Sequence, residues 1–213
     1  MVTIILERHG QSEGNSFKLF TGHKNVNLTE LGLKQVERTA EYIAENYKVD
    51  RIYSSDLKRA VVTAKFVSDK TGIEIIENEK LRELYAGKWD GTCFDEIEKN
   101  YADDWKIWRE DVGNSRCTGG ESVKELGERF LGALTKIAEE NDGKTVVVAT
   151  HATPIRVTQC LLGGKTLDDM KNIPWGSNAS LTILEYDKGN WTIVKQSFDE
   201  HLGDLLTNLP ANV

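Results

Sequence analysis

Short runs of apolar residues recur along the chain, and their composition indicates strands. Residues 2–6 (VTIIL) and 145–150 (TVVVAT) are almost continuously apolar and rich in β-branched side chains. This pattern is typical of strands that are buried on both faces of a parallel sheet. Weaker runs of the same kind lie at 52–54 (IYS) and 73–76 (IEII). We therefore expect a strand at each of these places, with the first two in the centre of the sheet.

Apolar residues at helical spacing fill the segments between those runs. Their spacing of three and four residues predicts amphipathic helices. The three sets are Leu33, Val36, Ala40 and Ile43; Leu57, Ala60, Ala64 and Val67; and Val123, Leu126, Phe130 and Ile137. The last of these helices is expected to begin with a capping box formed by Ser122 and Glu125. Helices that alternate with strands predict an α/β fold with right-handed crossovers.

The remaining segments follow other patterns. Residues 180–187 (SLTILEYD) and 191–198 (WTIVKQSF) flank a turn at 188–190 (KGN), which predicts a β-hairpin that adds antiparallel strands to the sheet. Residues 85–121 are aromatic and acidic, and we expect them to form a helical insertion over the sheet. The predicted architecture is a three-layer α/β/α sandwich with a mostly parallel central sheet, in a single domain over residues 1–213.

Composition and charge limit the classes of partner. The chain has 213 residues, of which 34 are acidic and 27 basic, and its formal net charge is −7. A nucleic acid or an anionic membrane requires a broad basic surface, so neither is expected as a partner. No segment reaches the length of about 18 apolar residues that a membrane span needs. The first apolar run also lacks the basic start and the length of a signal peptide.

The cysteines indicate neither a disulfide framework nor a zinc site. Cys93, Cys117 and Cys160 are widely spaced and form no CxxC pair. We therefore expect a cytoplasmic protein, and because no cluster of carboxylates is apparent, we expect no metal and no other cofactor. An edge strand of the C-terminal hairpin is a candidate for pairing across a homodimer.

Two of the four histidines follow the two strongest predicted strands. Arg8 and His9 end the first run, and His151 follows the second. Ligands of open α/β sheets bind beyond the carboxyl ends of the strands, so these side chains would share one crevice if the strands are parallel neighbours. Thr153 as N-cap and Pro154 in the first turn predict a helix that begins beside His151 and offers free amides to an anion.

Arg59 adds a second guanidinium to the predicted crevice. It lies in SSDLKRAVVTA (54–64), which follows a weaker strand and begins a helix, with Arg59 in the second helical turn. Either arginine alone has an ordinary interpretation as a surface or ion-pairing residue. Two guanidiniums, two imidazoles and the amides of a helix start, assembled in one place, would bind a tetrahedral dianion such as phosphate.

Five motifs resemble those of the histidine phosphatase superfamily, the phosphoglycerate mutase-like proteins. They occur in the family's order and extend over nearly the whole chain. The motifs are Arg8-His9-Gly10, SSDLKRAVVTA (54–64), LRELYAGKWDG (81–91), GGES (119–122) and ATHATPIR (149–156). The first triplet alone is a weak signal, whereas the five together are highly specific.

The resemblance implies a phosphohistidine mechanism. His9 matches the nucleophile that accepts the phosphoryl group, and Glu83 matches the proton donor to the leaving oxygen. Ala152 stands where family members commonly have glycine, although its backbone amide can still donate. The residues that match the phosphate pocket are Arg8, Asn15, Arg59, His151 and Ala152, and those that match substrate contacts are Thr21 and Gly22.

Elementary chemistry agrees with these roles. An imidazole attacks phosphorus only when it is neutral, and the cations Arg8 and Arg59 disfavour the protonated form of His9. The same cations stabilise negative charge on the transferring oxygens. Glu83 has to be protonated to expel an alkoxide.

The insertion favours hydrolysis over the mutase reaction. A mutase grips a second anionic group and therefore brings extra arginines and lysines in this segment. Residues 85–121 instead contain nine Asp or Glu and five Lys or Arg. We expect at least half of their aromatic side chains to form a core of the insertion: Tyr85, Trp89, Phe94, Tyr101, Trp105 and Trp108.

The sequence thus predicts a phosphomonoesterase that acts on a small phosphorylated metabolite, with the insertion as part of the active-site cover. A phosphoglycerate mutase is the alternative enzyme. A phosphate-binding module that has lost catalysis is the alternative from another class, although binding alone would not need Glu83. His23 and His201 have no predicted role.

Overall fold

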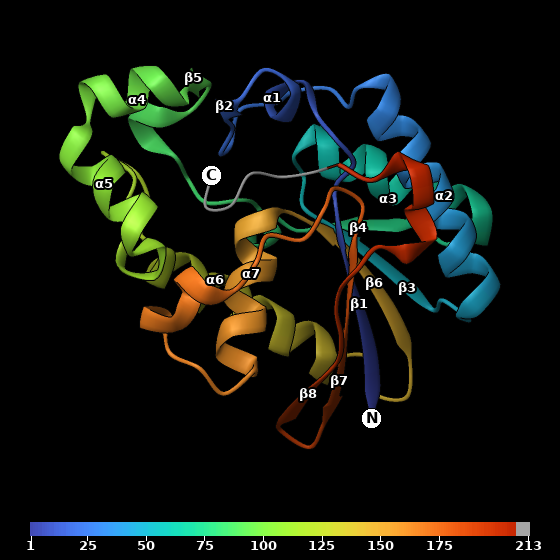
Figure 1. Ribbon diagram of the computed structural model, residues 1–213. Coiled ribbons are helices and arrows are strands. Elements are labelled where there is room, and N and C mark those ends of the chain that lie inside the picture. Colours follow the sequence, from blue (N-terminus) through green and yellow to red (C-terminus); the bar gives the residue numbers. More distant parts are fainter. Residues whose placement is uncertain (208–213) are drawn as a thin grey trace.

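A mixed sheet of six strands lies at the centre of the computed structural model, which describes residues 1–207 (Figure 1). The strands are β1 (Val2–Arg8), β3 (Arg51–Ser54), β4 (Ile75–Glu77), β6 (Thr145–Thr150), β7 (Leu181–Asp187) and β8 (Asn190–Phe198). Their order is β4-β3-β6-β1-β7-β8. The first four strands in this order are parallel, whereas β7 is antiparallel to both β1 and β8. The predicted mostly parallel sheet with antiparallel C-terminal strands is therefore confirmed.

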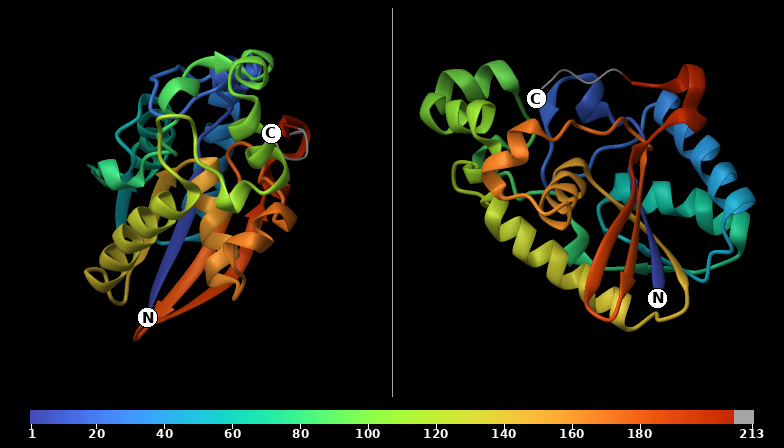
Figure 2. Two further views of the ribbon diagram at one scale, coloured as in Figure 1. Left: turned by 90° about the vertical axis from the view of Figure 1, so that its left-hand side faces the viewer. Right: turned by 60° about the horizontal axis from the view of Figure 1, so that its bottom comes forward.

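Helices cover both faces of the sheet. They are α2 (Glu30–Asn46), α3 (Lys58–Thr71), α6 (Val123–Glu139) and α7 (Ala152–Leu162). Ile43 of α2 and Val67 of α3 share a buried cluster with Ile5, while Phe130 of α6 and Ile155 of α7 belong to a cluster on the other face. The right-hand view of Figure 2 shows the sheet between these two pairs of helices. The three-layer α/β/α sandwich is thus confirmed.

The prediction for one residue of the apolar helix faces is wrong, because that residue is exposed. Leu33, expected on the apolar face of α2, is 40% exposed. The buried side of α2 instead includes Gln35 and Thr39, whose side chains donate to the carbonyl oxygens of Leu205 and Ala179 at 2.8 and 3.0 Å. Polar residues can occupy buried positions when their hydrogen bonds are satisfied in this way, which a count of apolar residues does not show.

Two helix starts also differ from the prediction. The N-cap of α7 is His151, so Thr153 is already inside the helix, where its N–H is bound by a side chain from another segment. The helix α3 begins at Lys58, which places Arg59 in the first turn instead of the second. The capping box of Ser122 and Glu125 at the start of α6 is confirmed.

The strand boundaries show smaller differences. The strand β4 begins two residues later than its apolar run, at Ile75. The turn of the C-terminal hairpin consists of Lys188 and Gly189, and Asn190 already belongs to β8. Both turn residues have positive φ, 47° and 90°, which is the conformation of a type I′ two-residue hairpin turn.

The insertion forms two helices beside the upper end of the sheet (Figure 1). These are α4 (Phe94–Asn100) and α5 (Ala102–Glu110). A short strand before them, β5 (Thr92–Cys93), pairs with β2 (Leu19–Phe20), which follows α1 (Glu13–Ser16). The sequence did not predict this second sheet. Trp89, Trp105 and Trp108 are buried in one cluster, so half of the insertion's six aromatic residues are in a core. Contrary to the prediction, this core is not the insertion's own, because Phe20 and residues of α6 and α7 share it.

Three predictions concern the chain as a whole: its lack of a membrane span, its pairing in a homodimer and its single domain. Within residues 1–207, no helix has the length and apolar character needed to cross a membrane. The strand β8 lies at one edge of the sheet, and a homodimer formed through it stays a prediction. The single domain over residues 1–213 also stays a prediction, and its last residues, 208–213, lie outside the described part of the chain.

Candidate active site

The carboxyl ends of β1 and β6 and the amino end of β7 meet at one edge of the sheet. Arg8, the last residue of β1, is paired with Thr150, the last residue of β6. Leu181 at the start of the antiparallel strand β7 is paired with Glu7, so β7 begins at the same edge. His9 and His151, which follow β1 and β6, consequently lie together, and their ring centroids are 5.3 Å apart.

His9 is buried and held in one tautomer. Its Nδ1 lies 2.8 Å from the carbonyl oxygen of Gly10, which can only accept, so Nδ1 carries the hydrogen and Nε2 carries a lone pair. The Nε of Arg59 donates to this Nε2 at 3.3 Å. Burial, followed by the charges of Arg59 and Arg8, holds the pKa of His9 well below its ordinary value. The imidazole is therefore neutral, and its single Nε2 lone pair accepts from Arg59. His9 becomes a nucleophile when that lone pair turns from Arg59 to a phosphorus atom.

Arg8 and Arg59 flank His9 with two buried guanidiniums. Arg8 donates to the carbonyl of Gly176, and its Nε has no hydrogen-bond partner among residues 1–207. Arg59 donates to the carbonyl of Gly22 at 2.8 Å and to that of Lys24 at 3.1 Å. Burial lowers the pKa of each arginine to about 10, so both remain charged at neutral pH. The site therefore carries two fixed positive charges beside a neutral imidazole.

His151 lies behind His9 and has one ring nitrogen without a contact. Its Nε2 is 2.9 Å from Oγ of Ser55, the residue that follows β3. Its Nδ1 is buried and has no hydrogen-bond partner in the described part of the chain. Burial and the charge of Arg59 lower the pKa of His151. His151 is therefore a second neutral imidazole, and one of its buried ring nitrogens has no partner among residues 1–207.

The Glu83 carboxyl group contacts the start of α7. Its Oε2 accepts from the N–H of Thr153 at 3.2 Å, and its Oε1 accepts from the N–H of Leu84 at 2.7 Å. A carboxylate is favoured at a helix N-terminus, where the N–H groups have no partner within the helix. The sequence predicted that the amides at the start of this helix are free to bind a substrate anion. The amide of Thr153 is instead bound by Glu83.

Asn178 belongs to the site, although the sequence did not indicate it. Its Nδ2 donates to the carbonyl of His9 at 3.2 Å and to Oδ1 of Asn15 at 3.1 Å. The N–H of Ser12 donates to the same Oδ1, so the NH₂ group is the part of Asn15 that remains for a ligand. Asn178 precedes β7, and the amino end of an antiparallel strand lies at the edge where its parallel neighbours end. The predicted hairpin therefore contained a signal that could have located this residue.

Thr21 and Gly22 lie in a loop between Arg59 and the Glu83 segment. The carbonyl of Thr21 accepts from Arg59 at 3.3 Å, and the N–H of Gly22 donates to the Asp90 carboxylate at 2.9 Å. A Cβ atom on Gly22 would lie 2.6 Å from the carbonyl oxygen of Leu84. Only glycine therefore permits this close approach of the two backbones.

The two histidines without a predicted role lie in different places. His23 follows Gly22, and its Nε2 lies 2.9 Å from the Glu83 carbonyl oxygen. His201 lies outside the site, where it contacts Oγ1 of Thr39 at 2.8 Å and stacks on Tyr42. Only His23 is thus placed to influence the site.

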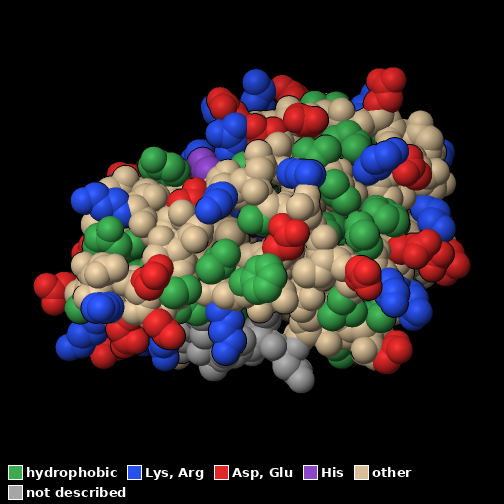
Figure 3. Space-filling model, turned by 90° about the horizontal axis from the view of Figure 1, so that it is seen from above, with side chains coloured by type: hydrophobic (Ala, Val, Ile, Leu, Met, Phe, Trp, Pro, Cys, Tyr) green, Lys and Arg blue, Asp and Glu red, His purple; other side chains and the backbone are tan. Residues whose placement is uncertain are grey.

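A cavity of about 570 Å³ opens at this edge of the sheet. Its inner wall includes Arg8, His9, Asn15, Thr21, Glu83 and Ala152. Its outer wall includes Lys18, Trp175 and the insertion residues Phe94, Asp95, Glu98, Trp105, Trp108 and Arg109. Acidic and basic side chains are interspersed over the face seen from above (Figure 3). The residues predicted for phosphate and those of the insertion thus line one space, with Arg59 and His151 behind His9.

The donors at the base of this cavity suit a tetrahedral oxyanion next to a nucleophile, which is the arrangement of a phosphoryl-transfer protein. Within residues 1–207, no group of three or more His, Cys, Asp or Glu side chains is arranged to hold a metal ion. The family model of the histidine phosphatase superfamily (branch 1) matches residues 4–199. The chain therefore belongs to this superfamily, and the resemblance seen in the sequence is confirmed.

Individual proteins show the same relationship. Phosphoserine phosphatase 1 from Hydrogenobacter thermophilus is 31% identical over 204 residues, which cover 96% of this chain and 96% of that protein. Phosphoglycerate mutase from Schizosaccharomyces pombe is 33% identical over 203 residues, which cover 92% and 95%. The solved structure of YhfR from Bacillus stearothermophilus has a TM-score of 0.91 at 27% identity and covers 95% of this chain and 100% of that chain. The similarity thus extends over nearly the whole chain.

Proposed function

We propose that this protein is a metal-independent phosphomonoesterase that hydrolyses a small phosphorylated metabolite through a phosphohistidine on His9. The observation that carries the proposal is the environment of His9 Nε2. This atom holds a lone pair on a neutral, buried imidazole and contacts the guanidinium of Arg59 at 3.3 Å. A nucleophile beside fixed cations is what transfer of a phosphoryl group requires.

In the first step, Nε2 of His9 bonds to phosphorus while the bond from phosphorus to the ester oxygen breaks. The guanidiniums of Arg8 and Arg59 stabilise the phosphoryl oxygens, together with the NH₂ group of Asn15, the His151 ring and the amide of Ala152. The buried Nε of Arg8 and Nδ1 of His151, which lack partners within residues 1–207, support this role. Buried polar atoms are otherwise hydrogen-bonded, so a ligand oxygen would complete their contacts.

Glu83 supplies the proton that the leaving oxygen needs. It lines the same cavity as His9, and its protonated carboxyl group would give its hydrogen to the departing alkoxide. In the second step the carboxylate takes a proton from water, the water oxygen bonds to phosphorus, and Nε2 recovers its electron pair. Inorganic phosphate leaves and Glu83 is protonated again, so the cycle closes.

The outer cavity wall supports a phosphatase acting on a compact substrate. Besides aromatic side chains, it carries Lys18 and Arg109 of one sign and Asp95 and Glu98 of the other. This balance does not concentrate positive charge for a second phosphate. A similar protein is named phosphoserine phosphatase 1, which makes O-phosphoserine the first substrate to test.

A phosphoglycerate mutase is the second candidate. A relative that is 33% identical carries that name, and Lys18 and Arg109 are available for a substrate carboxylate. Incubation with 3-phosphoglycerate and a trace of 2,3-bisphosphoglycerate distinguishes the two enzymes. Rapid appearance of 2-phosphoglycerate, faster than release of phosphate, would establish the mutase.

The deciding experiment is a screen of phosphomonoesters with the wild-type protein, His9→Ala and His201→Gln as a control histidine outside the site. We expect wild type and the control to release phosphate and to form an acid-labile phosphoenzyme, and His9→Ala to do neither. Substantial turnover by His9→Ala would refute the mechanism. Phosphate affinity without turnover of any compound would instead indicate a binding module.

A further inference from the structure

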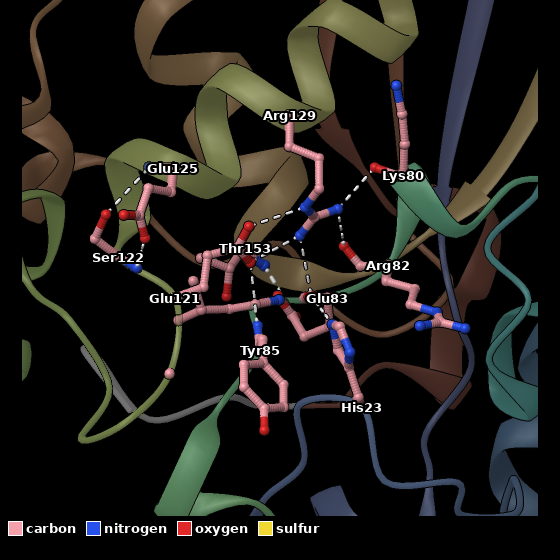
Figure 4. Close-up of polar contacts among 12 residues, drawn as sticks. His23, Lys80, Arg82, Glu83, Tyr85, Glu121, Ser122, Glu125, Arg129 and Thr153 are labelled. Carbon is pink, nitrogen blue, oxygen red and sulfur yellow. Dashed lines mark hydrogen bonds and ion pairs between the residues drawn. The ribbon is translucent and has the colours of Figure 1, made fainter.

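The backbone that carries Glu83 is held by the side chain of Arg129, which projects from α6 (Figure 4). Its Nη1 donates to the carbonyl oxygens of Lys80 and Arg82 at 2.7 and 3.2 Å. Its Nη2 donates to the carbonyl oxygen of Glu83 itself at 3.3 Å. One guanidinium thus binds three carbonyl groups within four residues of chain, ending at Glu83.

Glu121 fixes this guanidinium from the other side. Its Oε1 accepts from Nε of Arg129 at 2.9 Å, and its Oε2 accepts from Nη2 at 2.8 Å. The same Oε2 accepts from the N–H of Tyr85 at 3.2 Å. The Arg129 and Glu121 side chains are only 23% and 14% exposed. Such a bidentate, partly buried ion pair has a specific geometry. Through it, the carbonyl groups before Glu83 are linked to the N–H of Tyr85 after it.

His23 completes the support from the opposite direction. The Glu83 carbonyl oxygen, which accepts from Arg129, also lies 2.9 Å from Nε2 of His23. The Glu83 side chain is then directed by the N–H groups of Leu84 and Thr153. Figure 4 shows Glu83 between His23 and Arg129, with Thr153 beside it. The backbone of Glu83 is therefore fixed from two sides, and its carboxyl group by a third element.

We propose that Arg129, oriented by Glu121, is a positioning residue that sets the place of the Glu83 carboxyl group relative to His9. The inference rests on the proposed function, in which Glu83 protonates the leaving oxygen. Arg129 binds the backbone of this segment and does not line the cavity, so it acts through Glu83. A shift of about 1 Å in a reacting group can reduce a rate on the order of 100-fold, which makes such support consequential.

The chemistry of the leaving group separates this role from a purely structural one. Phenyl phosphate and 4-nitrophenyl phosphate have similar shapes, but phenoxide is much more basic than 4-nitrophenoxide and needs its proton more. Misplacing a proton donor therefore slows phenyl phosphate selectively. A general loss of folded protein, or of phosphate binding, would lower the rates for both esters by the same factor.

The test measures kcat/KM for both esters with wild type, Arg129→Met, Arg129→Lys, Glu121→Gln and Glu83→Gln. The matched control is Arg116→Met. Arg116 precedes α6 and forms an ion pair at 2.5 Å with Glu125 of α6, and both side chains are about half exposed. Arg129→Met is expected to lose on the order of 10- to 100-fold for phenyl phosphate and less than about 3-fold for 4-nitrophenyl phosphate. Arg129→Lys and Glu121→Gln should show smaller losses with the same selectivity, and Arg116→Met should match wild type.

The outcomes distinguish the inference from the proposed function. If Glu83→Gln is selective for the basic leaving group but the Arg129 variants are not, the positioning role is refuted and the proton donor stands. If Glu83→Gln itself shows equal losses for both esters, the proposed proton donor fails, and the role of Arg129 with it. If Arg129→Met does not fold, Arg129→Lys decides, because it keeps the charge but cannot bind Glu121 and three carbonyls with one planar group.

Discussion

The Nε atom of Arg59 donates a hydrogen bond to Nε2 of His9 at 3.3 Å. Both side chains are buried, and the remaining nitrogens of Arg59 bind carbonyl groups of the loop at 21–24. One guanidinium therefore affects three properties of the site: the charge state of His9, the direction of its lone pair and the position of the substrate loop. This coupling makes Arg59 the most informative residue to change after His9.

Replacing Arg59 with methionine should lower kcat/KM by about 100- to 1,000-fold, because the transferring oxygens lose a fixed cation. Arg59 also lowers the pKa of His9, so its removal should raise that pKa. The acidic limb of the pH profile of kcat/KM is then expected to move to higher pH. An NMR titration of the His9 ring in wild type and variant measures this shift directly. An acidic limb at the wild-type position would contradict the electrostatic role of Arg59.

The two buried histidines should make the protein less stable in mild acid. The folded state holds the pKa of His9 and of His151 well below the ordinary value, whereas an unfolded histidine has a pKa of about 6.5. Below that pH the unfolded chain binds protons that the folded chain does not, so the free energy of unfolding falls with falling pH.

Urea unfolding at several pH values tests this linkage. The maximum slope is about 1.4 kcal/mol per pH unit for each histidine. A His9→Asn, His151→Asn double variant should show a weaker dependence between neutral and mildly acidic pH than wild type. Equal slopes in the two proteins would refute the explanation.

Glu7 should destabilise the fold at neutral and alkaline pH. It lies in β1 beside Ala149 and Leu181, is completely buried, and neither carboxyl oxygen has a hydrogen-bond partner among residues 1–207. Burial raises its pKa well above the ordinary value. The folded state therefore retains a proton that the unfolded state releases, and stability falls as pH rises through this range.

Glu7→Met should remove the cost of burying this carboxyl group and raise the free energy of unfolding by about 1–3 kcal/mol at a pH of about 7.5. The gain should be smaller in acid, where the wild-type carboxyl group is neutral in both states. Paired urea titrations of wild type and variant at the two pH values measure the difference. A variant that is less stable than wild type at the higher pH would show that Glu7 has a favourable partner.

Chelation of metal ions should leave turnover unchanged. The proposed mechanism uses guanidiniums and imidazoles where other phosphatases place metal ions, so no step depends on a cation from solution. Activity before and after dialysis against EDTA, assayed with the best substrate from the screen, is expected to agree. Loss of activity that returns on adding a divalent ion would contradict metal independence.

The sequence was sufficient for the central elements of the fold. Continuous β-branched runs located β1 and β6, and helical spacing located α2, α3 and α6, because burial in regular structure repeats with a fixed period. The same local pattern misplaced Leu33, since Gln35 and Thr39 occupy the buried side of α2 through hydrogen bonds to distant carbonyls. The pairing of β2 with β5 was also missed, because each strand has only two residues and carries no period.

For the site, the sequence by itself determined that His9 and His151 follow the two strongest strands. The structure showed that these strands are parallel neighbours, and because parallel strands end at a common edge, the two histidines meet there. The structure alone decided how Glu83 reaches that edge and what holds it. Arg129 lies 46 residues from Glu83 along the chain, and the path of the intervening loops brings them together. Contacts of that kind depend on loop geometry and side-chain direction, which no periodicity in the sequence encodes.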